Sequence, residues 1–310
     1  MRIVLTGGDG FIGKHLCQRL HKRGYEIIVV DNNITSKEEN YDLSNVTHYK
    51  EGIETFDLNK LDKVDVIYHM ASIASPLVYK KDFNNVYLPN VKGTENMIEL
   101  AKRDDAQLFY FSTSEVYGSL SPVDDLQNGI VENHESISHL LTERSIYSTS
   151  KKMGEELVNQ YLIKGGKGVI FRLFNVYGPN MDTVNPGYGR VMPNFMTAIN
   201  ANDPVTIFGD GTQVRSFLWI DDLLDALELI QKEEDLPHVL NIGNAEPVSI
   251  NDLAEIFFKL MNNNTGITYK TMDHDDPIWR KPNCARVEEC IDWTPKVSLQ
   301  EGLKILLNKF

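Results

Sequence analysis

Over the first 180 residues, short apolar runs alternate with stretches in which apolar positions recur at helical spacing. The runs are rich in β-branched residues and apolar throughout, which is typical of strands buried on both faces of a sheet. We predict strands over 2–7, 26–31, 46–50, 64–71, 108–113 and 168–178, and helices over 11–24, 84–103 and 147–162. Strands separated by helices indicate an α/β fold with a doubly wound parallel sheet.

The pattern changes after residue 179. Residues 180–192 are rich in Asn, Pro, Gly and Asp and are predicted to form a loop, and the Asn-rich 262–266 is predicted to end a helix. Short strands follow at 205–209, 239–243 and 267–270, and the pattern of 217–230 predicts a helix that packs on the first lobe. We therefore expect a first domain over 1–179, with 217–245 crossing back to it, and a smaller C-terminal α/β lobe mainly over 180–310.

Composition narrows the functional classes. The 310 residues include 31 Lys and Arg against 44 Asp and Glu, a formal charge of −13 that disfavours nucleic acid but leaves room for a small anionic ligand. No apolar run reaches the ~18 residues of a membrane span, and the chain starts with a strand rather than a signal peptide. Cys17, Cys284 and Cys290 have no metal-ligand spacing, so we expect no metal, no membrane and a reducing, cytoplasmic compartment.

The strongest local motif is TGGDGFIG, which spaces Gly7, Gly10 and Gly13 as GxxGxxG between a predicted strand and helix. Gly7 permits a tight turn, Gly10 lets the backbone approach a pyrophosphate, and Gly13 allows close packing of the helix on the sheet. The next strand ends in Asp31, where a carboxylate can accept hydrogen bonds from the adenosine ribose. These residues predict a Rossmann-type nucleotide domain that prefers NAD, because Asp31 repels the 2′-phosphate of NADP.

A second motif, YSTSK, places Tyr147 and Lys151 one helical turn apart, so that phenol and ammonium share a face. A nearby ammonium stabilises a phenolate and makes it a usable base. The run Thr113-Ser114-Glu115 ends a predicted strand, at the edge of a parallel sheet where ligands bind. We interpret these five residues as catalytic candidates, and His69 as a structural histidine at the end of a strand.

With these motifs the chain resembles the extended short-chain dehydrogenase/reductase superfamily over nearly its whole length. The resemblance includes TGGDGFIG, HMA (69–71), STSEVYG (112–118), YSTSK (147–151), RLFNVYGP (172–179) and RSFLWIDD (215–222). It implies that Thr113, Tyr147 and Lys151 act on a nucleotide sugar. It also implies cofactor contacts from Gly7, Gly10, Phe11, Ile12, Gly13, Asp31, Asn32, Asn33, Thr35, Ser36, Ala71, Ser72, Asn90, Tyr147 and Lys151.

Within the superfamily, the chain looks most like the UDP-glucuronate decarboxylases. The stretches that carry this likeness are DNNITS (31–36), HMASIASPLVY (69–79), STSEVYG and DDPIWRKPN (275–283). The chain departs from that branch at Ile73, at RSIY (144–147) and in the longer loop 180–195. The resemblance implies that Arg215 and Arg280 hold a diphosphate near Asn175, and that Phe208 lies against the uracil or ribose. The full set of implied substrate contacts is Ser75, Tyr79, Asn175, Arg190, Phe208, Arg215 and Arg280.

The implied reaction oxidises C4 of the sugar with NAD, releases carbon dioxide from the resulting β-keto acid and reduces the ketone to give UDP-xylose. Sugar 4,6-dehydration and 4-epimerisation remain alternatives that start with the same oxidation. Ser114 stands where dTDP-glucose dehydratases have an aspartic acid, and is a poor acid at neutral pH. A non-catalytic NAD-sensing regulator is a remote alternative, which the complete set of Thr113, Tyr147 and Lys151 disfavours.

The resemblance also implies a homodimer. In the family, the two long helices, here predicted over 84–103 and 147–162, pair across a twofold axis as a four-helix bundle. A twofold contact is the commonest oligomer symmetry. The candidate apolar contacts are Val91, Met97, Leu157 and Tyr161.

Overall fold

The computed structural model describes residues 1–36, 44–74, 81–118, 128–134, 142, 145–181, 191–272 and 276–308. Its internal contacts divide the chain into two units. The first comprises Met1–Val116, Glu143–Arg172 and Lys232–Leu240, and the second comprises Tyr117–Thr142, Leu173–Gln231 and Asn241–Phe310. The segment that returns to the first unit is therefore shorter than the expected 217–245, and 117–142 groups with the second unit.

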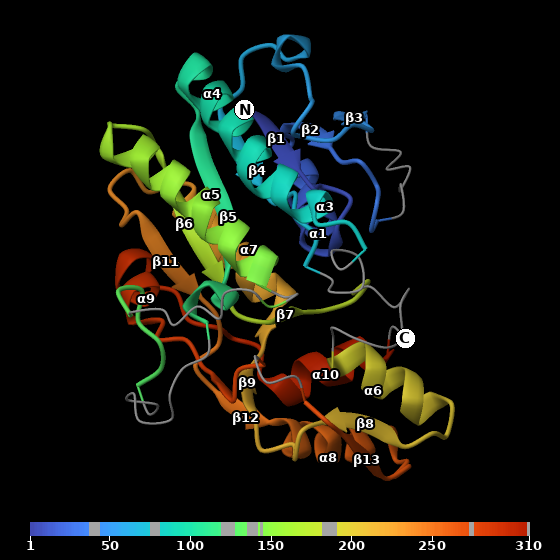
Figure 1. Cartoon of the computed structure of the whole chain (residues 1–310). Coiled ribbons are helices and arrows are strands. Elements are labelled where there is room, and N and C mark those ends of the chain that lie inside the picture. Colours follow the sequence, from blue (N-terminus) through green and yellow to red (C-terminus); the bar gives the residue numbers. More distant parts are fainter. Residues whose placement is uncertain are drawn as a thin grey trace. The chain divides into compact units, whose positions relative to one another are not determined.

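The first unit is built on a seven-stranded sheet with the order β11-β6-β5-β4-β1-β2-β3 (Figure 1). The neighbouring pairs β1–β2, β1–β4, β2–β3 and β4–β5 are all parallel. From β1 the sheet extends to β2 and β3 on one side and to β4 and β5 on the other. This strand order confirms the prediction of a Rossmann-type, doubly wound sheet. The strands are β1 (Arg2–Thr6), β2 (Glu26–Val30), β3 (Val46–Tyr49), β4 (Val66–His69), β5 (Gln107–Thr113), β6 (Gly168–Leu173) and β11 (Val239–Ile242).

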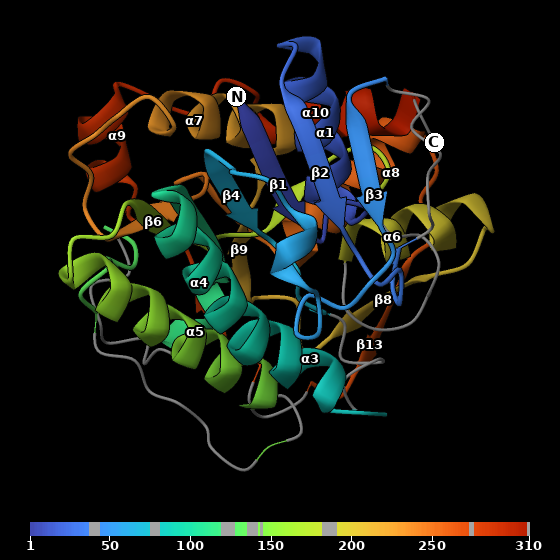
Figure 2. The same ribbon diagram turned by 90° about the horizontal axis from the view of Figure 1, so that it is seen from above.

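Helices cover this sheet. The helical segments of the unit are α1 (Phe11–Lys22), η1 (Leu58–Lys60), α3 (Asn84–Leu88), η2 (Pro89–Gly93), α4 (Thr94–Asp104), η3 (Ser114–Tyr117, at the boundary of the second unit) and α5 (Ser145–Ile163). Helices α4 and α5 lie side by side on one face, and α1 packs against β1 and β2 (Figure 2). Strand residues such as Val4 and Leu108 are buried with Met97 and Val158 in one apolar cluster.

The predicted helix over 84–103 is present but not regular. Between α3 and α4, residues Pro89–Gly93 form a wider π-helical turn. Proline has no backbone N–H and cannot donate the usual helical hydrogen bond, which explains a local change of winding there. Asn90, a residue of the site described below, lies in this turn.

The candidate dimer contacts need a correction. Val91, Met97 and Tyr161 are 8%, 0% and 7% exposed, and Leu157 packs against the same internal cluster. Val91, Met97 and Tyr161 are therefore buried within the protomer and expose little surface to a partner, whereas Leu157 is only partly buried. The sequence pattern marked them as apolar but could not distinguish the internal from the external face of two packed helices. Apolar side chains that are exposed at these helices are Phe83, Tyr87, Met153 and Ile163.

The second unit contains three small sheets, β10–β7, β12–β9–β14 and β13–β8, with helices around them. Its elements are β7 (Val176–Tyr177), α6 (Val191–Asn200), β8 (Val205–Phe208), β9 (Val214–Ser216), β10 (Leu218–Trp219), α7 (Ile220–Ile230), β12 (Pro247–Ser249), α8 (Ile250–Met261), β13 (Ile267–Lys270), β14 (Trp279–Arg280), α9 (Ala285–Ile291) and α10 (Leu299–Asn308). As predicted, the Asn-rich segment ends a helix, because Asn262 adopts the left-handed conformation after α8.

Two predicted elements are divided in the structure. The strand expected over 168–178 stops at Leu173, because Asn175 has a positive φ of 32°, and resumes as β7. The helix expected over 217–230 begins only at Ile220, since Leu218 and Trp219 pair with β7 as a short strand. Helix α7 then contacts β7, β10 and α9 of the second unit.

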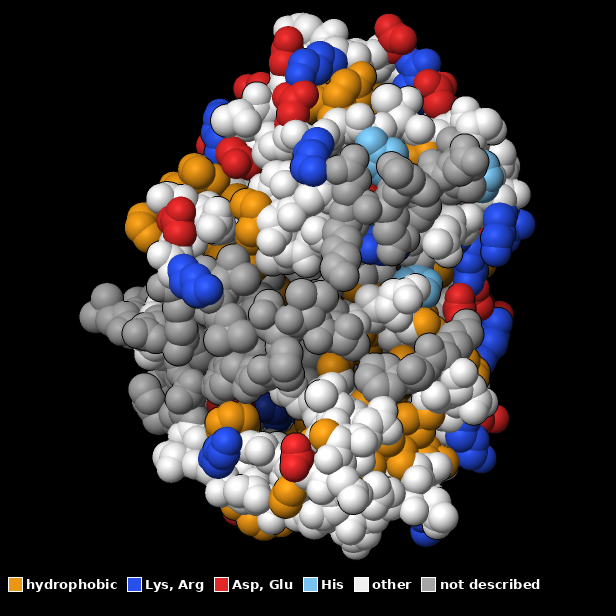
Figure 3. All heavy atoms as spheres, turned by 90° about the vertical axis from the view of Figure 1, so that its right-hand side faces the viewer, with side chains coloured by type: hydrophobic (Ala, Val, Ile, Leu, Met, Phe, Trp, Pro, Cys, Tyr) orange, Lys and Arg blue, Asp and Glu red, His pale blue; other side chains and the backbone are white. Residues whose placement is uncertain are grey.

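Charged side chains of both signs are interspersed among the described residues on the face drawn in Figure 3. Within the described part of the chain, no helix is both long and apolar enough to cross a membrane.

Candidate active site

The glycine turn links β1 to α1 and leaves open space at one position. Gly7 has a positive φ of 69°, and a Cβ there would lie 2.8 Å from the backbone of Ala71. A Cβ on Gly13 would lie 2.5 Å from the Gly7 carbonyl oxygen, so this glycine allows α1 to pack on the turn. A Cβ on Gly10 would meet the Gly7 carbonyl oxygen at 3.2 Å and, among the described residues, nothing else within 4 Å. The turn is therefore tight at two glycines and accessible at the third.

The amino end of α1 offers hydrogen-bond donors beside this space. The N-cap residue is Gly10, so the helix has no side-chain cap. The first turn, which includes Phe11 and Ile12, contains no acidic residue. The first N–H groups of a helix have no partner within the helix, and they carry a partial positive charge. The turn can therefore hold an anion such as a pyrophosphate.

Asp31 lies directly after β2 and is held by three donors. Its carboxylate accepts the backbone N–H of Asn33 at 2.8 Å, the backbone N–H of Asp9 at 3.1 Å and the hydroxyl of Ser36 at 3.2 Å. Burial is the largest cause that raises the pKa of Asp31, and the charge of Asp9 adds to it. The structure thus brings Asp31, Asn33 and Ser36 together. Asn32 and Thr35, the other candidates in this loop, are exposed.

A buried hydrogen-bond chain runs from β1 to α4 through His69. Thr6 Oγ1 accepts the N–H of Ala71 at 3.1 Å and shares a hydrogen bond of 2.7 Å with His69 Nδ1. On the other side, His69 Nε2 lies 3.1 Å from Thr94 Oγ1, which donates to the Asn90 carbonyl at 2.6 Å. Burial and the Lys151 charge lower the pKa of His69 to about 3, so the ring is neutral. The prediction of a structural histidine is confirmed.

Ser72 and Asn90 carry buried polar atoms that no described residue satisfies. Ser72 Oγ and Asn90 Oδ1 are both buried, and no described residue gives them a hydrogen bond. The other amide atom of Asn90, Nδ2, donates to Ser150 Oγ at 2.9 Å, and that hydroxyl donates to the Tyr147 carbonyl. Asn90 therefore ties the π-helical turn to the helix that carries Tyr147. A buried polar atom without a partner is rare and marks a place where a ligand or water can bind.

Lys151 is buried at the carboxyl end of β5. The residue is 2% exposed, its Nζ donates to the Phe111 carbonyl at 2.6 Å, and it lies 4.9 Å from the centre of the Tyr110 ring. Burial lowers its pKa to about 7, against the opposing charge of Glu155. Tyr147, one turn earlier on α5, packs against Ile73 and Val86. The motif therefore places an ammonium group of unusual acidity on the same helical face as a phenol.

The Thr113-Ser114-Glu115 run lies where β5 passes into η3. Thr113 Oγ1 accepts the backbone N–H of Glu115 at 3.2 Å, Ser114 is buried and Glu115 is half-buried. Lys151 bonds to Phe111, two residues before Thr113, so α5 meets β5 at this end of the strand. The three candidates and Lys151 therefore lie around the same strand end.

A buried ionic network that the sequence analysis does not predict lies beneath Lys151. Glu155, one turn after Lys151, accepts from Ser112 Oγ at 2.5 Å, and Arg172 donates to both of its oxygens, at 2.9 and 2.7 Å. The two charged side chains are 10% and 15% exposed. The spacing of Glu155 from Lys151 was the available signal, but an i+4 carboxylate is usually at the surface. The sequence pattern does not single out Asp9 either, because the glycines around it carry the motif.

The second unit gathers three of the substrate candidates. Arg215 and Arg280 are paired in register on the parallel strands β9 and β14. Arg215 donates to Asp276 at 3.2 Å, Arg280 is 2% exposed, and Asn175 donates to the carbonyl of Ser216, next to Arg215, at 3.0 Å. Guanidinium groups can bind a diphosphate bidentately.

Of the remaining substrate candidates, the structure describes only Phe208. Phe208 ends β8, and its carbonyl accepts from Gln213 at 2.6 Å, two residues before Arg215. Ser75, Tyr79 and Arg190 lie outside the described residues.

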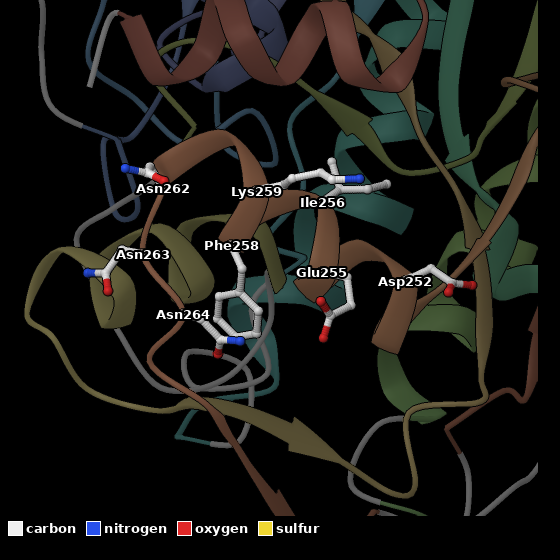
Figure 4. A pocket seen from close by; sticks show the side chains of 8 residues that line it. All are labelled: Asp252, Glu255, Ile256, Phe258, Lys259, Asn262, Asn263 and Asn264. Carbon is white, nitrogen blue, oxygen red and sulfur yellow. The ribbon is translucent and has the colours of Figure 1, made fainter.

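A cavity of about 520 Å³ also lies in the second unit, and it does not coincide with these candidates. Figure 4 shows Asp252 and Glu255 on α8 and the asparagine side chains that follow the helix. Asn175, Phe208, Arg215 and Arg280 do not line it. Among the residues that the structure describes, no group of His, Cys, Asp and Glu is arranged to hold a metal ion.

Comparison with known proteins extends over the whole chain. The family model described as "NAD dependent epimerase/dehydratase family" matches residues 3–243. UDP-glucuronic acid decarboxylase 1 of Arabidopsis thaliana is 37% identical over 318 residues, which cover 100% of this chain and 70% of the relative. UDP-glucuronic acid decarboxylase 1 of Xenopus tropicalis is 33% identical over 317 residues, with 100% and 72% covered.

Solved structures of nucleotide-sugar enzymes are also similar to the chain over its whole length. The UDP-glucose 4-epimerase of Thermotoga maritima has a TM-score of 0.90 at 28% identity and covers 100% of this chain and 98% of its own. The UDP-glucuronic acid 4-epimerase of Bacillus cereus, in complex with UDP-glucuronic acid and NAD, has a TM-score of 0.88 at 29% identity, with 100% and 98% covered.

Proposed function

Because this chain belongs to the NAD-dependent epimerase/dehydratase family, we propose that it is an enzyme that converts UDP-glucuronate to UDP-xylose and carbon dioxide. The observation that carries the choice of reaction is the full-length relationship to proteins named UDP-glucuronic acid decarboxylase, at 36–37% identity for those of Arabidopsis thaliana. The buried lysine and neighbouring phenol on α5 supply the base that the reaction needs.

The first unit would hold NAD. The residues fit this cofactor, since the space at Gly10 faces the uncapped end of α1 and the Asp31 carboxylate is presented by its three donors. The unsatisfied oxygen of Ser72 offers a further contact. When bound, NAD supplies a two-electron oxidant that is regenerated within the same turnover. The remaining contacts from the glycine turn, the 31–36 loop and the end of β4 stay predictions from the resemblance.

Tyr147 acts as the base. Its phenolate takes the proton of the sugar C4 hydroxyl, and the Lys151 ammonium, on the same helical face, favours the ionised phenol. Once C4 is a ketone, the C5 carboxylate belongs to a β-keto acid. The bond between C5 and the carboxylate breaks, and its electron pair moves into an enolate whose oxygen accepts hydrogen bonds from Tyr147 and Thr113. Glu115 and Ser114 orient the sugar around C5, where a proton is then added.

The second unit would hold the UDP moiety. Arg215 and Arg280, in register on β9 and β14, suit the two phosphates of the diphosphate, and Asn175 lies beside this pair. Phe208 is proposed to lie against the uracil or ribose. We further propose a reducing, cytoplasmic setting, because Cys17, Cys284 and Cys290 are an odd number of cysteines that lie far apart or lack metal-ligand spacing in the sequence.

The direct test is incubation of the full chain with NAD and UDP-glucuronate, followed by proton NMR of the nucleotide sugars and capture of released carbon dioxide. Appearance of UDP-xylose with stoichiometric carbon dioxide is the expected result. An alternative candidate is 4-epimerisation, which the likeness to the Bacillus cereus UDP-glucuronic acid 4-epimerase favours. It would give a product that retains the carboxylate, and a 4-keto-6-deoxy product from an NDP-hexose would instead indicate a dehydratase.

Two variants separate the steps. Tyr147→Phe should abolish every step, including reduction of the cofactor. Glu115→Gln should slow carbon dioxide release by about 10²-fold, the scale of a positioned acid–base group, while the absorbance of reduced cofactor still develops with UDP-glucuronate. Equal loss of both signals in Glu115→Gln would contradict its proposed role around C5.

We also propose a homodimer through a four-helix bundle formed by the α3–α4 segment and α5 of two protomers. The support is the exposed apolar side chains Tyr87, on α3, and Met153, on α5, which are 38% and 52% exposed.

A further inference from the structure

The proposed NAD site contains a second buried carboxylate, that of Asp9 in the glycine turn. Asp9 is 2% exposed. Its backbone N–H donates to Asp31 Oδ2 at 3.1 Å, and its Oδ2 accepts the side-chain amide of Asn33 at 2.8 Å. Asn33 also donates its backbone N–H to Asp31 Oδ1 at 2.8 Å. One residue, Asn33, therefore holds both carboxylates.

The side-chain hydrogen bonds that these two carboxylates accept from described residues come from neutral groups. Asn33 and Ser36, which contact the two carboxylates, are neutral. His48 Nδ1 lies 3.7 Å from Asp9 Oδ1, beyond hydrogen-bond distance. That oxygen is buried and receives no hydrogen bond from any described residue. A buried carboxylate in this state strongly opposes the approach of another anion.

We propose that Asp9 is a second determinant of nucleotide specificity, which together with Asp31 excludes a 2′-phosphate and holds Asn33 in place beside the adenosine ribose. The inference rests on the proposed function of the first unit as an NAD site. It goes beyond that function in assigning the discrimination between NAD and NADP to two carboxylates rather than to Asp31 alone.

The two carboxylates disfavour NADP because each repels the negative charge of its 2′-phosphate. A phosphate monoester carries between one and two negative charges at neutral pH. Each carboxylate nearby adds a repulsion that buried surroundings screen only weakly. Removing the Asp9 charge should therefore improve binding of NADP relative to NAD by about tenfold, on the scale of one charge interaction near a protein surface. The NAD ribose, which offers only hydroxyl groups, should lose little.

The test uses the full chain with radiolabelled NAD bound, and measures the concentrations of unlabelled NADP and NAD that displace half of the label. Asp9→Asn is the informative variant, because the asparagine oxygen can still accept from Asn33. Asp31→Asn is the positive control. Glu26→Gln is the matched negative control, since it removes one charge at the exposed opposite end of β2. We expect the NADP-to-NAD ratio to fall about tenfold in D9N and to stay unchanged in E26Q.

A ratio in D9N equal to that of the unmodified chain, with a changed ratio in D31N, would overturn the inference and leave Asp9 a structural residue. If D9N loses its native circular dichroism, D9S removes the same charge with a smaller side chain and gives the same two outcomes. A chain that binds no labelled NAD contradicts the proposed cofactor itself, and the inference falls with it. A chain that binds NAD but does not decarboxylate UDP-glucuronate contradicts only the proposed reaction.

Discussion

At the scale of single residues, the ionic pair of Glu155 and Arg172 should contribute strongly to stability. Both charges are largely buried, and the arginine donates to both carboxylate oxygens. Replacing Glu155 with Gln removes the carboxylate charge that two Arg172 nitrogens contact, which should lower the free energy of unfolding by about 3 kcal/mol. Urea denaturation measures this change in the free energy of unfolding.

The adjacent Glu156 provides a matched control for this prediction. Glu156 is exposed and accepts a hydrogen bond from Gln160. Glu156→Gln makes the same chemical change one position away and should alter the free energy of unfolding by less than about 0.5 kcal/mol. Similar effects of the two substitutions would show that burial of the pair contributes nothing.

Lys151 should make the stability of the protein depend on pH in a defined direction. The pKa of Lys151 is about 7 in the folded chain, whereas its usual value is 10.5. Between pH 7 and pH 10.5, the unfolded chain therefore binds a proton that the folded chain lacks. The contribution of Lys151 to stability therefore rises as the pH increases from 7 towards 10.5, and is lost as the pH falls to 7. Relative to Lys151→Met, the unmodified chain should gain stability between pH 7 and pH 9. Urea denaturation of both proteins at these two pH values checks the sign, and a constant difference would contradict it.

At the scale of elements, substitutions in the glycine turn should affect NAD binding and protein stability separately. Gly10 has a φ of −73°, which alanine adopts, and the space at its Cβ is open. Gly10→Ala should therefore fold normally but weaken NAD binding by at least about tenfold, since the methyl group occupies the proposed pyrophosphate space. Calorimetric titration with NAD gives the affinity.

Gly13→Ala should behave differently. Its Cβ would lie 2.5 Å from one backbone atom and 2.6 Å from another, and neither can move without shifting the turn. We expect a loss of about 1–3 kcal/mol in the free energy of unfolding, measured by urea denaturation. If Gly10→Ala were the more destabilising of the two, the assignment of roles to these glycines would be wrong.

The elements also show what the sequence could and could not predict. Periodicity located the strands and helices of the Rossmann-type sheet, because each signal is local to one segment. It did not locate the π-helical turn at Pro89, the break at Asn175 or the strand before Ile220, since these depend on what each segment packs against. The same reason applies to the site. Tyr147 and Lys151 form a local motif, whereas the roles of Asp9 and Glu155 depend on Asp31 and Arg172, 22 and 17 residues further along.

At the scale of the whole molecule, the proposed dimer makes a prediction about Met153. A glutamate at this exposed position would place a charge in the apolar contact between α5 helices, and should raise the dimer dissociation constant by at least about tenfold. Light scattering at micromolar concentrations should detect Met153→Glu as a monomer. Ile305→Glu on α10 is the control, because Ile305 is an exposed apolar residue of a different helix. A monomeric unmodified chain would contradict the proposal.

The discontinuity of the first unit has a consequence during synthesis. Strand β6 ends at Leu173, but its outer neighbour β11 begins only at Val239, after most of the second unit has been made. Ribosomes add roughly 5–20 residues per second, so the edge of β6 stays unpaired for several seconds on a nascent chain. An open strand edge is a template for aggregation. Ribosome-bound chains that stop near residue 180 should therefore need a chaperone, whereas chains that extend past β11 should not.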